Sequence, residues 1–233
     1  MSAIRENLQA VRYRISEAAD NAQRGQPVRL LAVSKTFGAE AVIAAAAAGQ
    51  QAFGENYLQE ALDKMARVHA LQPDLRLEWH FIGPIQSNKT RTIAEHFDWV
   101  HSVDREKIAQ RLSDQRPADL PPLNICLQVN ISGEASKSGV LPSEVVPVAN
   151  AIAQLPRIRL RGLMAIPEPE QDAAQQREPF RQMHVLYEYL RAEGLALDTL
   201  SMGMSGDMDA AIAEGATIVR IGSAIFGNRD YAK

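Results

Sequence analysis

Short apolar runs alternate with segments of helical periodicity along the whole chain, and this alternation limits the possible folds more than any other feature. The apolar runs that we expect to form strands lie at 28–34, 51–54, 77–82, 99–103, 124–131, 160–165, 199–202 and 217–221. Strands that alternate with helices form parallel sheets, because each parallel pair needs a long crossover. Eight such βα units in 233 residues match the size of a closed (β/α)8 TIM barrel. A doubly wound open sheet is the alternative.

Amphipathic segments separate these runs, and we expect helices at 39–48, 56–70, 87–96, 104–115, 142–154, 172–193 and 206–214. An extra helix over 2–24 precedes the first strand. Its apolar residues recur at steps of three and four, as one face of a helix requires: Ile4, Leu8, Val11 and Ile15. Gly25 and Pro27 predict its end. No linker or low-complexity tract interrupts the pattern, so we expect a single α/β domain over 1–233.

The composition points to a small solute as the partner. A formal net charge of -3 gives no basic field that would concentrate the protein on nucleic acid or on an anionic membrane. The N-terminal segment lacks the pattern of a signal peptide, and no apolar run reaches membrane-spanning length. Cys126 is the only cysteine, so no disulfide can form within the chain. We therefore expect a cytoplasmic protein that binds neither nucleic acid nor membrane.

Lys35 directly follows the first predicted strand, at the barrel end where active sites lie. A lysine at such a buried mouth is desolvated, which lowers the pKa of its ammonium and leaves an amine that can attack a carbonyl. This position predicts a Schiff base. The alternative is a lysine that extends outward from the strand end and pairs with a neighbour such as Glu55.

Two glycine- and serine-containing segments near the end of the chain resemble phosphate-binding loops. Residues 201–208 read SMGMSGDM and include Ser205, and residues 220–227 read RIGSAIFG and include Gly222 and Ser223. Glycine lets the backbone approach an anion, and helix N-termini attract negative charge. The loops after strands 7 and 8 are where TIM barrels commonly hold a phosphate. Alternatively, Ser205 could serve only as the N-cap of the following helix.

A carbonyl-reactive lysine beside a phosphate site suggests pyridoxal 5'-phosphate (PLP), and several motifs make the likeness specific. They are AVSK at 32–35, FGENY at 53–57, WHFIGPIQSNK at 79–89, RGLM at 161–164, LSMGMS at 200–205 and VRIGSAIFG at 219–227. In these motifs the chain resembles the pyridoxal phosphate homeostasis proteins of the YggS and PROSC type. The resemblance implies a type III PLP fold, the barrel of the alanine racemase N-terminal domain. Ser223 replaces the usual threonine, and Gly206 replaces a usual aspartate.

Carried over by motif, the resemblance implies that Lys35 forms the aldimine with PLP. Ser205, Gly222 and Ser223 would hold the phosphate, and Arg220 would face the pyridine nitrogen. Alternatively, Arg220 is an exposed strand-end charge that pairs with Asp207 or Asp209.

The remaining candidates lie at other strand ends. Asn56 and His80 would line the second and third, although a lone histidine in an apolar strand is commonly a hydrogen-bonded core residue. Met202, with Met164 and Met204, would pack on the ring or simply fill the core. Lys137 follows the fifth strand and is either solvated or a second, transient contact for the aldehyde or phosphate. We assign no catalytic or metal-ligating residue.

Three classes of function compete. The first is a non-enzymatic carrier that stores PLP or transfers it to PLP-requiring apoenzymes. The second is a PLP-dependent amino-acid racemase, which needs a proton carrier on each face of the substrate. By the resemblance, the opposing tyrosine of alanine racemase comes from a C-terminal β-domain, which we do not expect in a chain whose barrel pattern runs to Lys233. The third is a Schiff-base aldolase, for which no acid/base pair follows Lys35. We expect the carrier, as a monomer.

Overall fold

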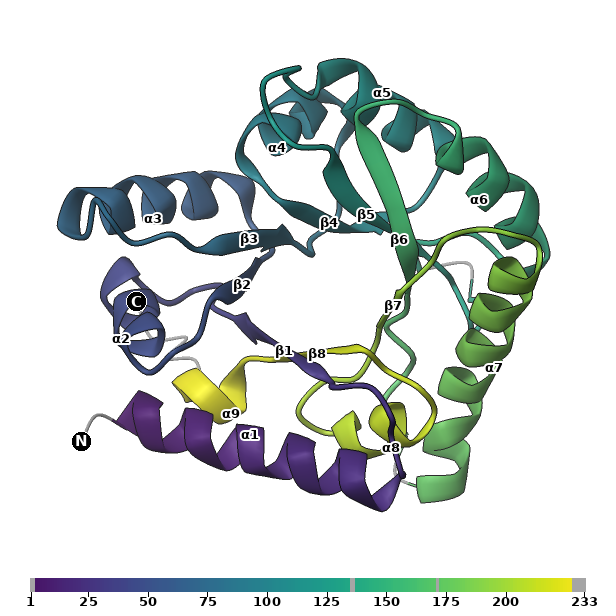
Figure 1. The fold of residues 1–233 in the computed structure, drawn as a ribbon, viewed down its shortest axis with the longest axis horizontal. Helices are drawn as coiled ribbons and strands as arrows, with labels where there is room; N and C mark the ends of the chain where they lie inside the picture. The colour runs from purple at the N-terminus through teal and green to yellow at the C-terminus, as the bar shows by residue number, and fades with distance from the viewer. Residues whose placement is uncertain (1–2, 135–136, 171, 228–233) are drawn as a thin grey trace.

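Eight parallel strands close into a barrel in the computed structural model, which describes residues 3–134, 137–170 and 172–227 (Figure 1). Each strand pairs with its neighbour in sequence, and β1 also pairs with β8, with Leu31 opposite Arg220. The strands are β1 Arg29–Val33, β2 Ala52–Glu55, β3 Glu78–Phe81, β4 Trp99–Val103, β5 Leu123–Gln128, β6 Ile158–Met164, β7 Thr199–Ser201 and β8 Ile218–Ile221. The predicted TIM barrel is confirmed, and the open sheet is wrong.

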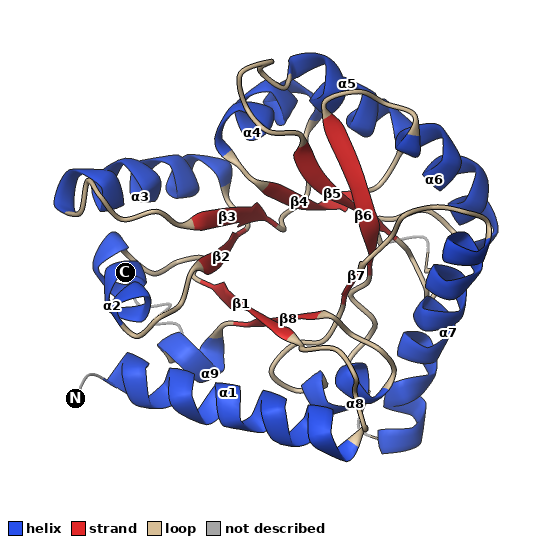
Figure 2. Cartoon of the chain, in the orientation of Figure 1, coloured by secondary structure: helices blue, strands red, loops and turns tan. Residues whose placement is uncertain are grey.

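Helices surround the barrel on its outer side (Figure 2). They are α1 Ala3–Asn21, α2 Ala39–Ala47, α3 Leu58–Leu71, α4 Thr90–His96, α5 Glu106–Gln115, α6 Val145–Ala153, α7 Ala173–Ala192, α8 Met208–Ala213 and α9 Ser223–Phe226, with 3-10 turns η1 Ser87–Lys89 and η2 Pro142–Glu144. Each predicted helix is therefore present. Two of them, predicted to begin at 87 and at 142, open with these tighter turns.

Helix α1 ends earlier than the glycine and proline signal predicts. Its last residue is Asn21, and Gln23 adopts a left-handed conformation with φ 51°. The amide of Gln23 donates to Asp20 O at 3.0 Å, and the amide of Arg24 donates to Ala19 O at 2.9 Å. This pair of bonds is a Schellman motif, in which a left-handed residue terminates the helix. The predicted end was wrong because a glutamine took the conformation that glycine usually supplies.

Strand β5 is also shorter than predicted, since it ends at Gln128 and not at residue 131. Beyond it the backbone pairs locally with the loop that follows. Asn130 donates to Val140 O at 2.9 Å, and Val140 donates to Gln128 O at 3.0 Å. The apolar residues after Gln128 therefore line the barrel mouth, where hydrophobicity alone cannot separate them from the strand.

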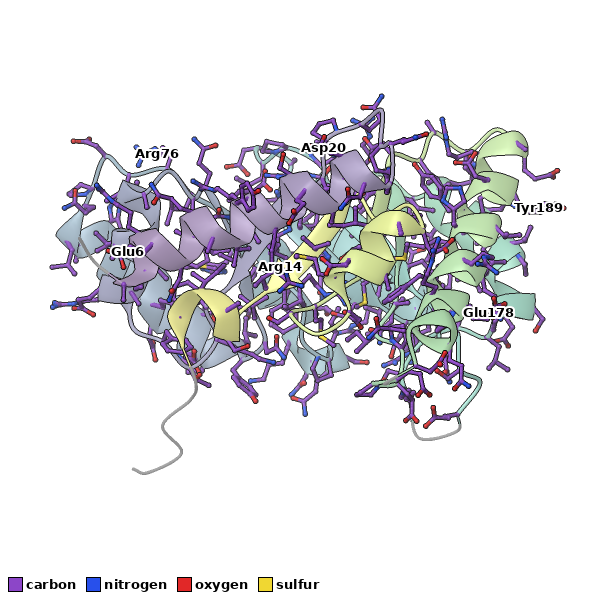
Figure 3. The ribbon with its side chains drawn as sticks, turned by 90° about the horizontal axis from the view of Figure 1, so that it is seen from below. Glu6, Arg14, Asp20, Arg76, Glu178 and Tyr189 are labelled. Carbon is purple, nitrogen blue, oxygen red and sulfur yellow. The ribbon has the colours of Figure 1, made fainter. Side chains whose placement is uncertain are left out.

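Helix α1 lies across the outer side of β1 and β8, beside α8 and α9 (Figure 1). Leu8, Val11 and Ile15 are buried on its inner face, as the periodicity predicts, and Ile4 is partly buried. Arg14 of α1 is labelled in Figure 3. It forms an ion pair with Asp209 of α8 at 3.0 Å. None of the described helices combines the length and the apolarity that a bilayer-spanning segment requires.

Candidate functional site

A cavity of about 530 Å³ opens at the C-terminal ends of the strands. Its volume lies within the range of about 300–1,000 Å³ that is typical of small-molecule sites. The residues that line it come from the ends of strands 1, 2, 3, 6, 7 and 8: Val33, Lys35, Phe37, Asn56, Ile82, Ile166, Met204, Ser205, Gly206, Arg220, Gly222, Ser223 and Gly227. The strand ends converge here because all strands run in the same direction around the barrel.

Six of the eight residues predicted for the site line this cavity: Lys35, Asn56, Ser205, Arg220, Gly222 and Ser223. The structure does not bring the other two, His80 and Met202, into the lining, and both are fully buried. Met204 is the methionine that lines the cavity, while Met164 packs with Trp99 and Cys126.

The two loops predicted to bind phosphate meet at one side of the cavity. The Ser223 hydroxyl lies 3.5 Å from the Ser205 hydroxyl, although the residues belong to different loops. Gly222 passes close to β1, since a Cβ atom there would lie 3.1 Å from Val33 O. A larger residue at 222 would therefore push the loop away from β1.

The N-cap of α8 is Asp207, so the alternative role of Ser205 as N-cap is wrong. Asp207 Oδ1 accepts a hydrogen bond from the Met204 amide at 2.6 Å, and the helix begins at Met208. Gly206 lies in this turn, and a Cβ atom there would meet nothing within 4 Å. Gly206, which replaces the usual aspartate, lies outside the helix, and Asp207 is the helix N-cap.

Arg220 is buried, with 4% of its surface exposed, although it lines the cavity. Its Nη1 donates to Ser201 Oγ at 2.7 Å and its Nη2 donates to Ala165 O at 2.9 Å. Burial lowers the pKa of the guanidinium to about 10, and the nearby Asp207 carboxylate acts in the opposite direction. The predicted alternative of an exposed strand-end arginine is wrong, and Asp209 instead pairs with Arg14.

Arg220 is also one end of a hydrogen-bonded chain through the barrel interior. Ser201 Oγ lies 2.7 Å from His101 Nδ1, His101 Nε2 lies 2.8 Å from His80 Nδ1, and His80 Nε2 contacts Glu78 Oε1. Glu78 begins β3 at the opposite end of the barrel, where Arg29 donates to it at 2.7 Å.

The polarity of this chain follows from its two ends. Burial lowers the pKa of His80, against the opposing effect of Glu78, and lowers the pKa of His101 well below its ordinary value, so both rings are neutral. Because the Glu78 carboxylate only accepts, His80 carries its proton on Nε2 and accepts on Nδ1. His101 then donates from Nε2, and the Ser201 hydroxyl donates to His101 Nδ1. Every donor points from Arg220 toward Glu78.

Lys35 is partly buried at the cavity rim and lies in a turn that follows β1. Glu55, the partner that the sequence offers for a structural role of Lys35, forms an ion pair with Lys64 at 2.6 Å and accepts from Ser34 Oγ at 2.5 Å. Lys64 was not predicted to belong to the site. The signal was its place in α3, since it shares the buried face with Ala61 and Val68.

A second cavity of about 310 Å³ adjoins the first and shares Asn56, Ile82 and Ile166 with it. Lys137 lines this second cavity, and its side chain is 27% exposed. It is therefore less solvated than the alternative of a simply solvated lysine predicts. Its ammonium lies 3.4 Å from both Glu134 and Glu168. Across the described part of the chain, no cluster of histidine, cysteine or acidic residues could hold a metal ion.

The chemistry of the first cavity suits a small anionic carbonyl compound. It combines one lysine amine, one buried guanidinium, two hydroxyls and a close-packed glycine. Asn56 adds a buried Oδ1 atom that has no hydrogen-bond partner among the described residues. These groups fit a phosphorylated aldehyde such as PLP, which needs donors for its phosphate and an amine for its aldehyde.

Comparisons with known proteins agree with this chemistry. The sequence profile of the alanine racemase N-terminal domain matches residues 6–230. The pyridoxal phosphate homeostasis protein of Pseudomonas aeruginosa is 63% identical over 232 residues, which are 99% of this chain and 98% of that protein. PipY of Synechococcus elongatus PCC7942, solved with PLP bound, is 37% identical with a TM-score of 0.83, over 96% of this chain and 100% of that chain.

Alanine racemases share the fold at lower identity. The alanine racemase of Corynebacterium glutamicum has a TM-score of 0.69 at 19% identity, over 99% of this chain and 61% of that chain. This likeness concerns the barrel alone. The chain belongs to the family of pyridoxal phosphate homeostasis proteins, which is built on the barrel of the alanine racemase N-terminal domain.

Proposed function

We propose that this protein binds PLP as a Schiff base on Lys35 and holds it for storage or for transfer, without a reaction of its own. The observation that carries the proposal is the convergence of Lys35, Arg220, Ser205 and Ser223 on one cavity of suitable size. It is supported by the relatives, which are named for PLP homeostasis, and by PipY, which binds PLP.

The phosphate would be held by the hydroxyls of Ser205 and Ser223 together with the close-packed backbone at Gly222. Arg220 would face the pyridine nitrogen. A guanidinium there donates a hydrogen bond and opposes protonation of the nitrogen, so the ring withdraws electrons less strongly than when a carboxylate keeps it protonated. This arrangement suits storage better than chemistry that needs a stabilised carbanion.

The covalent step requires the neutral amine of Lys35. The amine attacks the aldehyde carbon, and its two protons leave with the aldehyde oxygen as water, so that a C=N bond replaces the C=O bond. Release is the reverse step, in which water returns the aldehyde. A lowered pKa of Lys35 at the cavity rim, which would favour the neutral amine, stays a prediction.

The lining argues for a carrier and against a racemase. Two-base racemisation needs a proton carrier on each face of the substrate carbon. The described residues that line the cavity contain Lys35 and the strongly basic Arg220, but no tyrosine, histidine, cysteine or carboxylate. The racemase alternative therefore lacks its second base in this cavity. The aldolase alternative lacks its acid/base pair for the same reason.

We also propose the setting of this function. The single barrel domain over 1–233 would act as a monomer in the cytoplasm, where the buried and only cysteine needs no oxidising environment. Its partners would be PLP itself and apoenzymes that require PLP. Lys137, in the adjoining cavity, would make a second and transient contact.

The test is an absorbance spectrum of the protein with PLP, followed by borohydride reduction and peptide mapping. We expect an imine band, a stable label on Lys35, and loss of both in Lys35→Ala. Lys107→Ala, which changes an exposed lysine on α5, is the matched control and should bind as the unchanged protein does. A label on another residue would overturn the site, and a protein that shows no imine band with PLP would overturn the function.

A further inference from the structure

The turn that carries Lys35 is held in an unfavourable backbone conformation. Ser34 O accepts a hydrogen bond from the Phe37 amide at 3.1 Å, which closes a turn with Lys35 as its second residue. The third residue, Thr36, has φ 70°, a left-handed conformation that is rare for a β-branched side chain and normal for glycine or asparagine. Such a conformation persists only where surrounding contacts enforce it.

Helix α3 supplies those contacts through two residues one turn apart. Glu60 Oε1 accepts from the Thr36 amide at 2.6 Å. Lys64 Nζ donates to Ser34 O at 2.7 Å, and it also lies 3.0 Å from Glu60 Oε1. The backbone is therefore gripped on both sides of Lys35, at residue 34 and at residue 36.

Glu55 of β2 completes the cluster. Its Oε1 accepts from Lys64 Nζ at 2.6 Å and from Ser34 Oγ at 2.5 Å. The side chains of Lys64 and Glu55 are 3% and 0% exposed, and Glu55 Oε2 is buried without a hydrogen-bond partner among the described residues. Burial accordingly raises the pKa of Glu55, against the effect of Lys64.

Stability alone does not explain a charged cluster on the buried face of a helix. Desolvation offsets much of the attraction in a buried ion pair, and apolar residues of similar size are often as stabilising. The cluster's contacts are instead directed at a single feature, the backbone on either side of Lys35. We propose that Glu55, Glu60 and Lys64 are positioning residues that set the direction of the Lys35 amine toward the cavity. This inference rests on the proposed function of Lys35.

The two sides of the site then have separate roles, one in imine formation and one in phosphate binding. Attack on the aldehyde carbon depends on where the amine points, so it depends on the cluster. The grip on the phosphate would come from the loops after β7 and β8, which carry Ser205 and Ser223, whereas the cluster belongs to β2 and α3. Loss of the cluster should therefore weaken imine formation and spare phosphate binding.

Glu60 is the best position for a test, because its side chain is 35% exposed. When Glu60 is removed, the buried ammonium of Lys64 still pairs with Glu55. Glu60→Ala removes the acceptor for the Thr36 amide, whereas Glu60→Gln keeps an amide oxygen at the same distance along the chain. Two ligands separate the steps: PLP, and pyridoxine 5'-phosphate, which has an alcohol in place of the aldehyde. The readouts are the rate at which the imine band grows with PLP, and the affinity for pyridoxine 5'-phosphate by calorimetry.

We expect Glu60→Ala to slow imine formation by about tenfold, a size consistent with a small displacement of a reacting group. Its affinity for pyridoxine 5'-phosphate should be unchanged, and Glu60→Gln should recover most of the rate. Glu40→Ala is the matched control, since Glu40 is an exposed glutamate on α2. It pairs at 3.3 Å with Arg67, which lies on α3 as Glu60 does. The control variant should leave both readouts unchanged.

A second variant, Glu55→Gln with Lys64→Met, removes both buried charges together and should show the same selective loss. Wild-type imine formation in Glu60→Ala, or a parallel loss of both ligands in either variant, would overturn the inference, the second outcome because it indicates a purely structural role. An unchanged protein that forms no imine with PLP would instead overturn the proposed function. The two failures are thus distinguishable.

Discussion

Ser201→Ala tests the hydrogen-bonded chain between Arg220 and Glu78. This chain depends on one hydroxyl that both accepts and donates a hydrogen bond. Ser201 Oγ accepts from Arg220 and donates to His101, each at 2.7 Å, and the residue is fully buried. Alanine removes both bonds and leaves a guanidinium donor and an imidazole acceptor without this partner. A bond to a charged group contributes about 1.5–3 kcal/mol and a neutral one about 0.5–1.5 kcal/mol.

The expected loss in free energy of unfolding is therefore about 2–4.5 kcal/mol. Ser113→Ala is the matched control, because Ser113 is equally buried but makes one neutral bond, to Pro156 O. We expect a loss of about 1 kcal/mol there.

The assay is urea unfolding followed by circular dichroism. A loss of about 3 kcal/mol moves the midpoint by about 1 M at an m-value of about 3 kcal/mol/M, with the m-value itself unchanged. Equal losses in the two variants would refute the double role of Ser201 and, with it, the assigned polarity of the chain.

Two further predictions concern buried titratable groups. Burial lowers the pKa of His80 and of His101, so below about pH 6.5 the unfolded chain binds more protons than the folded one. As the pH is lowered below this value, the free energy of unfolding should therefore decrease, by up to about 1.4 kcal/mol per pH unit for each ring. Urea titrations from about pH 7 to 5 check this, and a flat profile contradicts it. Burial raises the pKa of the Cys126 thiol to about 12, so it should react with a thiol reagent only as fast as the protein unfolds, and rapid labelling of the native protein contradicts it.

The barrel was predictable because its signal is repeated eight times, and errors at single boundaries do not change the topology. The cavity at the strand ends was predictable for a related reason, since a parallel barrel brings every residue that follows a strand to the same face. Lys35 and Ser223, which follow the first and eighth strands, could therefore be placed on one face from the sequence, whereas the role of Arg220, which lies within the eighth strand, was suggested by the family resemblance. The boundary errors at Asn21 and Gln128 arose where the local backbone, and not hydrophobicity, ends the element.

The interior contacts could not be predicted in this way. His101 and Ser201 lie on β4 and β7, and their contact depends on the stagger and inward orientation of strands that are not neighbours in the sheet. Lys64 is hidden for a different reason. It is a charged residue on an otherwise buried helix face, and its partners on β1 and β2 become neighbours only when the helix packs on the barrel.

The pairing of β1 with β8 has a consequence for how the binding site comes into being. Lys35 follows the first strand, whereas Arg220 lies in the eighth, so the two face one cavity only after the first and last strands have met. During synthesis on the ribosome, the chain must therefore be made through β8 before the proposed PLP site is complete. A ligand that binds only the closed barrel stabilises it by mass action, so bound PLP would stabilise the pairing of β1 with β8.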